Sequence, residues 1–427
     1  MSGYPSRPRP DSRTQTVAQQ SIYLDYAATT PVDPRVARLL MRYLTQRGQF
    51  GNPSSNTHAF GRNAARTVET ARERVAALLG ADPGEIIWTS GATEANNLAL
   101  RGIMQAYARK GRHLITAKTE HKAVLDVGRQ LEREGCTVTW LDPEPNGLLS
   151  SQQLAAALRP DTVLVSLMHV NNETGVSQDL ATLGTLIHSH GALLHVDAAQ
   201  SIGKLPLDLR ILPVDLLSVS AHKLYGPKGI GALYVRRRPR VRLEPLLYGG
   251  GQERGLRAGT LPVHQIAAMG KACEIALAEM GTEQARIRKW RDWLWQGLRE
   301  LEGVALNGHP QPEHHSPNIL NLSFSGIAAE ALLHALPEIA LATGSACNSA
   351  LHEPSHVLRA MGHDLMRMRG AIRFSLGRFT TAEEIEYTID AVAAAVTRLR
   401  ALSPTWEAPP GKLKQPPVDW AAPSNMA

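Results

Sequence analysis

A histidine and a lysine follow an apolar segment in SVSAHKLYGPKGIG, residues 218–231, and a turn rich in glycine and proline comes directly after them. A lysine that is partly removed from water binds its proton less tightly, so its free amine can attack an aldehyde and form a Schiff base. Lys223 is therefore a candidate nucleophile. Four other lysines lie near predicted strand ends: Lys118, Lys122, Lys204 and Lys228. Because surface lysines are common, Lys223 needs support from its surroundings.

Two further segments carry groups that suit an anion and a cation. In SGATEANN, residues 90–97, a strand pattern gives way to a helical pattern, so free backbone amides and the Thr93 hydroxyl meet at a helix start that suits a phosphate. In HVDAAQ, Asp197 ends an apolar run and Gln200 follows. An ionised carboxylate at the mouth of a buried strand is costly without a cation, and a protonated ring nitrogen would supply one.

The remaining polar strand ends supply a ring and two amides: His121 in TEHKAV, and Asn171 and Asn172 in MHVNNETG. A phosphate cradle, an acidic partner for a pyridinium, a flat group to stack and a lysine together match pyridoxal 5′-phosphate. Each group alone has a commoner structural role, since His121 and Asp197 could simply cap helices. Their joint occurrence, in chain order on one kind of scaffold, favours the cofactor.

Seven short apolar runs alternate with helix-length segments from about residue 85 to 235. They are EIIWTS, HLITAK, CTVTWL, TVLVSLMHV, ALLHVDA, DLLSVSA and GALYV. This spacing predicts βα units and a mostly parallel sheet covered on both faces, with catalytic residues at the strand ends. A long amphipathic helix is expected from about residue 275 to 300. NILNLSF, AIRFSLG and a final helix from Thr381 to about Leu402 indicate a smaller α+β domain.

The chain is expected to divide into four parts. Residues 1–20 should form a disordered arm, and residues 21–275 a large cofactor-binding domain whose first residues could pack with the small domain. Residues 276–403 should form that small C-terminal domain. Residues 404–427 are rich in proline and are predicted to be extended or disordered.

Ten segments in chain order resemble the cysteine desulfurases of the housekeeping iron–sulfur-cluster type, within the class V aminotransferase family of fold-type I pyridoxal-phosphate enzymes. They are YLDYAATTPVDP, FGNPSS, SGATEANNLA, TEHKAVLD, HVNNETG, HVDAAQSIGKLP, AHKLYGPKGIGALY, GGGQERGLRAGTLP, GSAC and IRFSLGRFTT. The resemblance spans nearly the whole chain. It implies an α/β fold with a large, mostly parallel seven-stranded sheet domain and a smaller α+β domain, a homodimer, and conversion of L-cysteine to L-alanine.

The resemblance assigns roles around the cofactor at the matching positions. Lys223 would bind the cofactor aldehyde, Asp197 would pair with the pyridine nitrogen, and Gln200 would bond the ring oxygen. His121 would stack on the ring and act as a proton shuttle. The phosphate would be held by Thr93, Ser220, His222 and, from the other subunit of a homodimer, Thr260, and Ala92 would also belong to the cofactor site.

The substrate carboxylate would be gripped by Asn172, which also belongs to the cofactor site, and by Arg373. Arginine suits this task because its fork matches a carboxylate in two hydrogen bonds. Cys347 in GSAC matches the family's mobile nucleophile, which takes the substrate sulfur as a persulfide. The small residues before it offer little to pack, so the sequence also indicates a mobile loop.

The other two cysteines, Cys136 and Cys273, lie in apolar periodic patterns and are predicted to be small packed hydrophobes. HEPSH, residues 352–356, matches the zinc-protease pattern HExxH. Pro354 would break the continuous helix that such a site needs, unless it starts the helix, and His352 would then lie outside it. We expect no metal site, although Cys347, His352 and His356 have residue types that could form one.

The bulk composition predicts a globular, soluble, cytoplasmic protein. The 427 residues are 43% hydrophobic and 20% charged, and no apolar run approaches the roughly 18 to 20 residues of a membrane span. The first twenty residues lack a signal's apolar segment. Their arginines make a transit peptide conceivable, but Asp11 and the clustered prolines favour a disordered arm. Three cysteines without CxxC spacing indicate reduced thiols.

Much of the net charge of +7 lies in RRRPRVR, residues 236–242, which favours a solvated edge over a surface for an acidic protein or a tRNA. No stable nucleic-acid binding is expected. The resemblance implies an iron–sulfur scaffold and other sulfur acceptors as partners, and possible service to tRNA thiolation. Thr343, Asn348, the basic HDLMRMRG segment and the proline-rich tail depart from close relatives, which weakens the scaffold prediction.

Two other classes of function compete with a desulfurase. A selenocysteine lyase or a small-substrate aminotransferase would share the fold, although Cys347 argues against the aminotransferase. A sulfur-relay or scaffold protein could retain the fold without catalysis. The joint presence of Lys223, Asp197, His121 and Cys347 argues against that alternative.

Overall fold

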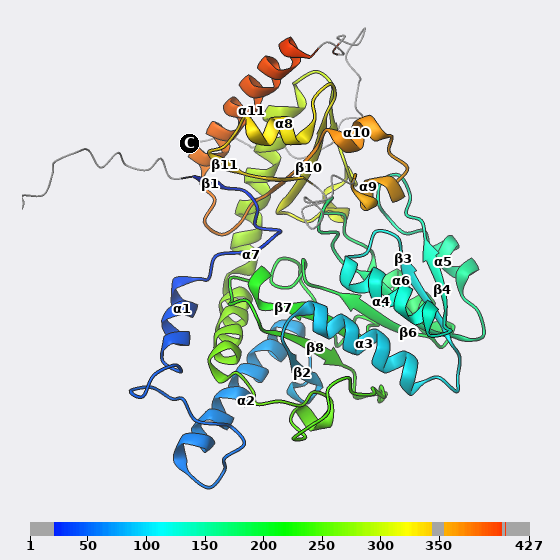
Figure 1. Cartoon of the computed structure of the whole chain (residues 1–427), viewed down its shortest axis with the longest axis vertical. Helices are drawn as coiled ribbons and strands as arrows, with labels where there is room; N and C mark the ends of the chain where they lie inside the picture. Colours follow the sequence, from blue (N-terminus) through cyan, green and yellow to red (C-terminus); the bar gives the residue numbers. More distant parts are fainter. Residues whose placement is uncertain (1–20, 344–353, 404–405, 407–427) are drawn as a thin grey trace, which may run out of the picture.

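The computed structural model describes residues 21–343, 354–403 and 406, and each of the seven predicted apolar runs forms a strand of one sheet (Figure 1). The strands are β2 (Ile86–Thr89), β3 (His113–Ala117), β4 (Thr137–Leu141), β5 (Thr162–Met168), β6 (Leu193–Asp197), β7 (Leu216–Ser220) and β8 (Gly231–Val235). Their order is β2-β8-β7-β6-β5-β3-β4. Only β8 runs antiparallel to its neighbours, which confirms the predicted mostly parallel seven-stranded sheet.

Helices cover both faces of this sheet because its strands are apolar on both sides. In β7, Leu216 packs in a cluster with α3 (Ala92–Ala106) and α4 (Lys122–Arg133). The next residue, Leu217, packs on the opposite face with α2 (Ala59–Leu79), α6 (Leu180–Ser189) and the first part of α7. This alternation follows from the two-residue period of a strand. Two shorter helices, α1 (Pro34–Met41) and α5 (Ser151–Ala157), complete this half of the molecule.

The long helix α7 (Val263–Arg299) connects the two halves of the molecule (Figure 1). It begins twelve residues before the predicted position, because its first turns, through Ala276, are buried in the core of the large sheet. Lys271 and Glu274 form a partly exposed ion pair on these turns, so the amphipathic pattern of α7 begins earlier than the sequence prediction placed it. Farther along, Leu294 and Leu298 enter a second core. The domain division at residue 275 remains our proposal, since α7 passes through it without a break.

The second core lies against a four-stranded antiparallel sheet of order β12-β13-β10-β9. Its strands are β9 (Val304–Leu306), β10 (Ile319–Phe324), β12 (Ala342–Thr343) and β13 (Ala371–Ser375). Near the start of the chain, β1 (Ile22–Tyr23) pairs in parallel with β11 (Ile339–Ala340). The helices of this half are α8 (Ala329–His334), α9 (His356–Ala360), α10 (Leu365–Arg369) and α11 (Ala382–Leu402). A capping box between Thr381 and Glu384 starts α11, which confirms the predicted final helix.

The HEPSH segment does not begin a helix at Pro354, so that prediction was wrong by two residues. Helix α9 begins at His356 because Ser355 is its N-cap and accepts a hydrogen bond from the Leu358 amide. The Ser355 hydroxyl donates to Glu173, which ties the start of α9 to the large sheet. His352 and Cys347 lie outside the described residues. No helix in the described parts of the chain is long and apolar enough to cross a membrane.

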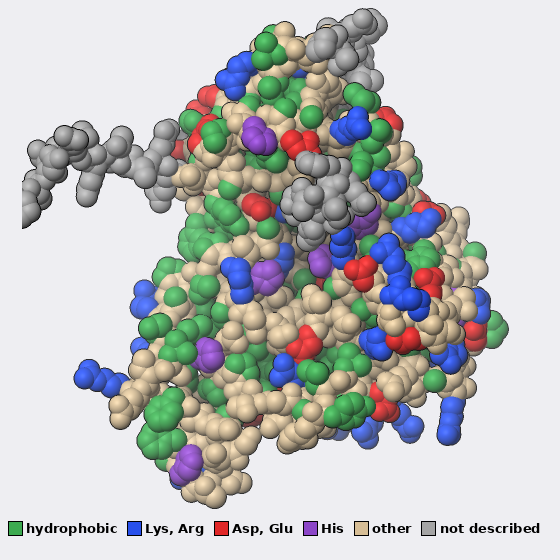
Figure 2. Space-filling model, in the orientation of Figure 1, with side chains coloured by type: hydrophobic (Ala, Val, Ile, Leu, Met, Phe, Trp, Pro, Cys, Tyr) green, Lys and Arg blue, Asp and Glu red, His purple; other side chains and the backbone are tan. Residues whose placement is uncertain are grey.

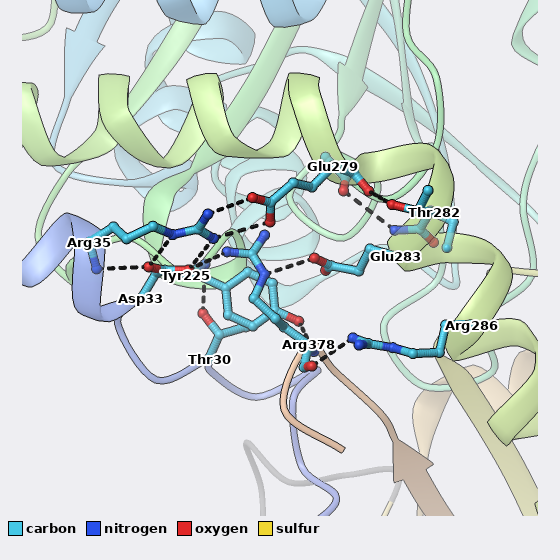
Figure 3. A network of polar contacts seen from close by, with 11 residues as sticks. Thr30, Asp33, Arg35, Tyr225, Glu279, Thr282, Glu283, Arg286 and Arg378 are labelled. Atoms are coloured by element: carbon cyan, nitrogen blue, oxygen red, sulfur yellow. Dashed lines mark hydrogen bonds and ion pairs between the residues drawn. The ribbon is translucent and has the colours of Figure 1, made fainter. Parts of the chain in front are cut away.

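An ion-pair network joins the two halves beside α7 (Figure 3). The Arg378 guanidinium, just after β13, donates to Glu283 Oε2 of α7 at 2.7 Å and to Asp33 Oδ2 at the start of α1 at 2.6 Å. The same guanidinium lies 4.2 Å from the centre of the Tyr225 ring. Arg35 adds a second pair of bonds to Asp33 and reaches Glu279. The network therefore links the start of α1, helix α7 and the segment after β13 to the turn that contains Tyr225.

Replacing Arg378 with methionine should destabilise the protein by about 3 to 5 kcal/mol, because it leaves the buried Glu283 carboxylate without a cation and removes one of the two arginines that pair with Asp33. The side chains of Asp33 and Glu283 are 3% and 8% exposed. Arg35→Met is the matched control, since Arg35 is 41% exposed and its loss should cost at most about 1 kcal/mol. Urea unfolding of the purified variants measures both. Equal losses in the two variants would contradict the prediction.

Candidate active site

The predicted site residues meet in one cavity of about 830 Å³ at the carboxyl ends of the parallel strands. Its lining includes Ala92, Thr93, His121, Asn172, Asp197, Gln200, Ser220, His222, Lys223 and Arg373. Asp197 is the last residue of β6 and Ser220 is the last residue of β7, so the strands themselves fix their positions. Figure 2 shows histidine and basic side chains gathered between the two halves of the molecule, on the face that it views.

Two predicted site residues are not among those that line the cavity. Thr260 is exposed in this single chain and contributes no surface to the cavity. Cys347 lies outside the described residues, but both ends of the undescribed segment adjoin the site. Thr343 pairs with Ile372, the neighbour of Arg373, and Pro354 lines the cavity.

Lys223 is positioned by a short turn directly after β7. Its Nζ donates to the carbonyl oxygen of Ala28 at 2.8 Å and to that of Ala27. Two residues later, Tyr225 has a φ of 59°, in the left-handed region that a tyrosine rarely adopts. The Thr30 hydroxyl accepts from the Tyr225 amide at 2.8 Å, and the Arg378 amide donates to the Tyr225 hydroxyl. These contacts hold the strained turn, and with it the backbone of Lys223.

Asp197 is a buried carboxylate that faces the cavity. It is 4% exposed, accepts from Asn96 Nδ2 at 2.8 Å and from the Ala199 amide at 2.9 Å, and forms no ion pair with any described residue. A buried carboxylate with hydrogen bonds but no cation can receive a protonated ring nitrogen. Asn96 was not predicted as a site residue, although its place in SGATEANN, on the buried face of the helix that follows the cap, is a signal for it.

The phosphate end of the cavity lies at the N-terminus of α3, which is 15 residues long. Its N-cap, Gly91, makes no side-chain capping bond, so amides of the first turn are left for another acceptor. Ser220 and His222 line the cavity beside it. Burial and the nearby Lys223 lower the pKa of His222 to about 4, so the ring is neutral at pH 7, and its Nδ1 lies 3.1 Å from the Thr29 hydroxyl.

His121 both caps a helix and lines the cavity, the two positions that its sequence context allowed. It is the N-cap of α4, where Nδ1 accepts from the Ala123 amide at 3.1 Å, and it also lines the cavity. Because Nδ1 is an acceptor, the proton of the neutral ring lies on Nε2. Its neighbour in the fold, His356, hydrogen-bonds the Glu120 carbonyl through Nε2. Among the described residues, no three His, Cys, Asp or Glu side chains could hold a metal ion.

The two asparagines of MHVNNETG have different surroundings. Asn171 bonds the Thr119 carbonyl and the amides of Glu173 and Thr174, so it holds the turn together. Asn172 lines the cavity, and its carbonyl accepts from Arg373 Nη1 at 2.8 Å. The Arg373 Nη2 donates to Asp25 at 2.7 Å. Since a guanidinium has five N–H groups, these two bonds leave further donors for a substrate carboxylate.

The other sequence candidates lie away from the cavity. Cys273 is fully buried, as predicted, and burial raises its thiol pKa to about 12; Cys136 is half-buried against the core. The RRRPRVR segment borders an open hollow of about 1670 Å³ on the large sheet's half. Arg236 pairs with Asp215 there, and the arginines that follow are exposed. This hollow lacks a lysine and a buried unpaired carboxylate, so the smaller cavity is the better candidate for catalysis.

The fold and the cavity define a fold-type I enzyme, and the chain belongs to the aminotransferase class-V family, whose model matches residues 22–388. The cofactor of this family is pyridoxal 5′-phosphate. A bare helix N-terminus, a buried carboxylate without a cation and a lysine in one cavity fit that group well.

Relatives with similar sequences and solved structures include proteins named for cysteine desulfurization. A protein named cysteine desulfurase IscS from Edwardsiella ictaluri is 56% identical over 401 residues, which cover 94% of this chain and 99% of that protein. A solved NifS-like protein has a TM-score of 0.82 at 37% identity, and the match covers 88% of this chain and all of that one. A solved structure described as SspA in complex with cysteine has a TM-score of 0.74 at 37% identity, covering 84% and 100%.

Proposed function

We propose that this protein is a cysteine desulfurase, which converts L-cysteine to L-alanine and passes the sulfur on as a persulfide of Cys347. The observation that carries this proposal is the single cavity in which Lys223, Asp197, the start of α3 and Arg373 meet, in a chain closely similar to proteins of that name. The same residues would serve a selenocysteine lyase. The test therefore compares selenocysteine with cysteine as the substrate.

Each described residue has a distinct task in this proposal. Pyridoxal phosphate, when bound, supplies an electron sink for the substrate's Cα. Lys223 would hold the cofactor through its Nζ, and the same amine would move the substrate's α-proton. Asp197 keeps the ring nitrogen protonated, because it is a buried carboxylate in need of a cation. Arg373 and Asn172 hold the substrate carboxylate at the small-sheet side of the cavity.

The sulfur step belongs to Cys347 and His121. The Cys347 thiolate forms an S–S bond with the substrate sulfur while the substrate's Cβ–S bond breaks. His121 Nε2 carries the ring proton and can exchange it with the substrate thiol, since its Nδ1 is engaged by the Ala123 amide. Protonation of the remaining three-carbon fragment yields alanine. The persulfide keeps the sulfur bound until an acceptor thiol attacks it.

The test is a stoichiometric assay on the purified full-length protein. We expect a yellow protein that forms alanine from L-cysteine and, with a reductant present, one sulfide for each alanine. Without the reductant, sulfur should remain on the protein at no more than one persulfide per chain. Selenocysteine should react no faster than cysteine. A colourless protein, or alanine formed only from selenocysteine, would contradict the proposal.

The proposed assembly is a cytoplasmic homodimer that delivers sulfur to an iron–sulfur scaffold protein and to other acceptors. Support for the dimer comes from Thr260, which the family resemblance assigns to the other subunit's phosphate site and which is exposed and away from its own chain's cavity. In the tail, Trp406 stacks on Arg400 at 3.9 Å. A pull-down with an iron–sulfur scaffold, using the full chain and a chain that ends at residue 406, tests whether the residues beyond Trp406 take part in docking.

A further inference from the structure

Lys204 is a buried lysine behind the cavity that the proposed reaction does not use. It lies in the segment after β6, is 6% exposed, and its Nζ donates to Gln200 Oε1 at 3.3 Å. No carboxylate among the described residues forms an ion pair with it. Burying an amine without such a partner is costly, so the position calls for a physical reason beyond packing.

The contacts of Lys204 continue through Gln200 to Lys223. Gln200 Nε2 donates to the Ala27 carbonyl at 2.8 Å, and Lys223 Nζ donates to the same oxygen. An ammonium group can only donate, so Lys204 requires the amide oxygen of Gln200 on its own side. A flipped amide would set two donors against each other at Lys204 and two acceptors against each other at Ala27. The NH₂ group of Gln200 is therefore directed away from Lys204, toward the side where Lys223 lies.

We propose that Lys204 is a positioning residue, which fixes the Gln200 amide with its NH₂ group presented to the cofactor's ring oxygen and adds a positive charge behind it. This inference rests on the proposed function, since it needs a cofactor in the cavity. It concerns a residue that touches neither cofactor nor substrate and that acts only through Gln200.

The charges around Lys204 make its hold on the Gln200 amide sensitive to pH. Burial lowers the pKa of Lys204 to about 7, and the charges of Lys223 and Arg373 act in the same direction, whereas Glu283 of α7 opposes them. Lys204 is therefore an ammonium below about pH 7 and becomes a neutral amine above it. A neutral amine can accept a hydrogen bond as well as donate one, so the orientation of Gln200 is less strictly fixed at higher pH.

A double-mutant cycle on the apoprotein tests the inference, with pyridoxal phosphate affinity measured by the visible absorbance that appears on binding. Lys204→Met keeps the side chain's length but removes its charge and its donors. We expect it to weaken cofactor binding roughly three- to tenfold, the equivalent of about one neutral hydrogen bond. In a Gln200→Ala background, Lys204→Met should have no further effect, because the two residues act in series. Lys118→Met, at an exposed lysine paired with Asp142, is the matched control.

A stability measurement separates positioning from a structural role. Removing a buried charge that lacks a carboxylate partner should leave Lys204→Met as stable as the wild type or more so. Lower stability together with unchanged cofactor affinity would overturn the inference. So would equal effects of Lys204→Met in the two backgrounds.

The wild-type protein offers an independent measurement if the variant fails to fold. The ratio of cofactor affinities of the wild type and Gln200→Ala should fall as the pH rises through about 7, as Lys204 loses its proton. A ratio that is independent of pH would overturn the inference. A wild-type apoprotein that binds no cofactor at all would instead overturn the proposed function.

Discussion

Replacing Lys223 with alanine should abolish alanine formation from L-cysteine, with a loss of at least about 100- to 10,000-fold, the usual range for removal of a general acid or base. The lysine has two tasks in the proposed reaction, since it anchors the cofactor aldehyde and moves the α-proton. The structure holds its Nζ at the Ala27 and Ala28 carbonyls, beside the buried Asp197.

The control for Lys223→Ala is Lys118→Ala, because Lys118 also follows a strand of the large sheet but is exposed and paired with Asp142. Alanine formation from L-cysteine measures both variants. After borohydride reduction, the wild type and Lys118→Ala should carry the cofactor on the peptide that contains Lys223. Lys223→Ala should carry none. Retention of a tenth or more of the wild-type rate in Lys223→Ala would show that another group moves the proton.

Much of the large sheet could be predicted from the sequence, because the apolar residues that identify each strand lie within that strand. A strand that is buried on both faces reads as a near-continuous apolar run, as β3, β5 and β7 do, whereas the edge strand β4 is only partly buried. The chemistry was predictable for the same reason, since parallel strands bring polar residues at their carboxyl ends to one edge. Lys223, Asp197 and His121 each follow or end such a run, so their meeting in one cavity needed no knowledge of distant contacts.

Other parts of the site depend on contacts between residues far apart in the chain, and no local pattern indicates them. Asp25 bonds Arg373 across 348 positions, and Asn96 bonds Asp197 across 101. Lys204 was set aside as one of several lysines near strand ends, because neither its burial nor the charges of Glu283 and Arg373 that act on it can be read from the local sequence. The early start of α7 was missed because its first turns consist mostly of small and apolar residues with few charges to mark a polar face.

The second large effect concerns sulfur transfer. Cys347→Ser should retain the cofactor and its colour but form no persulfide, and sustained desulfuration should fall by at least about 100-fold, because a neutral hydroxyl is a far weaker nucleophile than a thiolate. Cys347 stands four residues after Thr343, so extended chain could carry it no more than about 14 Å from there. Thr343 itself lies on the strand next to that of Arg373, and Arg373 lines the cavity.

Cys136→Ser provides the matched control, since Cys136 is half-buried against the core and away from the cavity, and it should leave persulfide formation unchanged. Cys273 cannot replace Cys347, because burial raises its thiol pKa to about 12 and leaves almost no thiolate at neutral pH. Mass spectrometry of the protein after a single turnover with L-cysteine would place the added sulfur. If Cys347→Ser still formed alanine at the wild-type rate, the substrate sulfur would have to leave without a protein nucleophile, and the chain would be a lyase instead of a sulfur carrier.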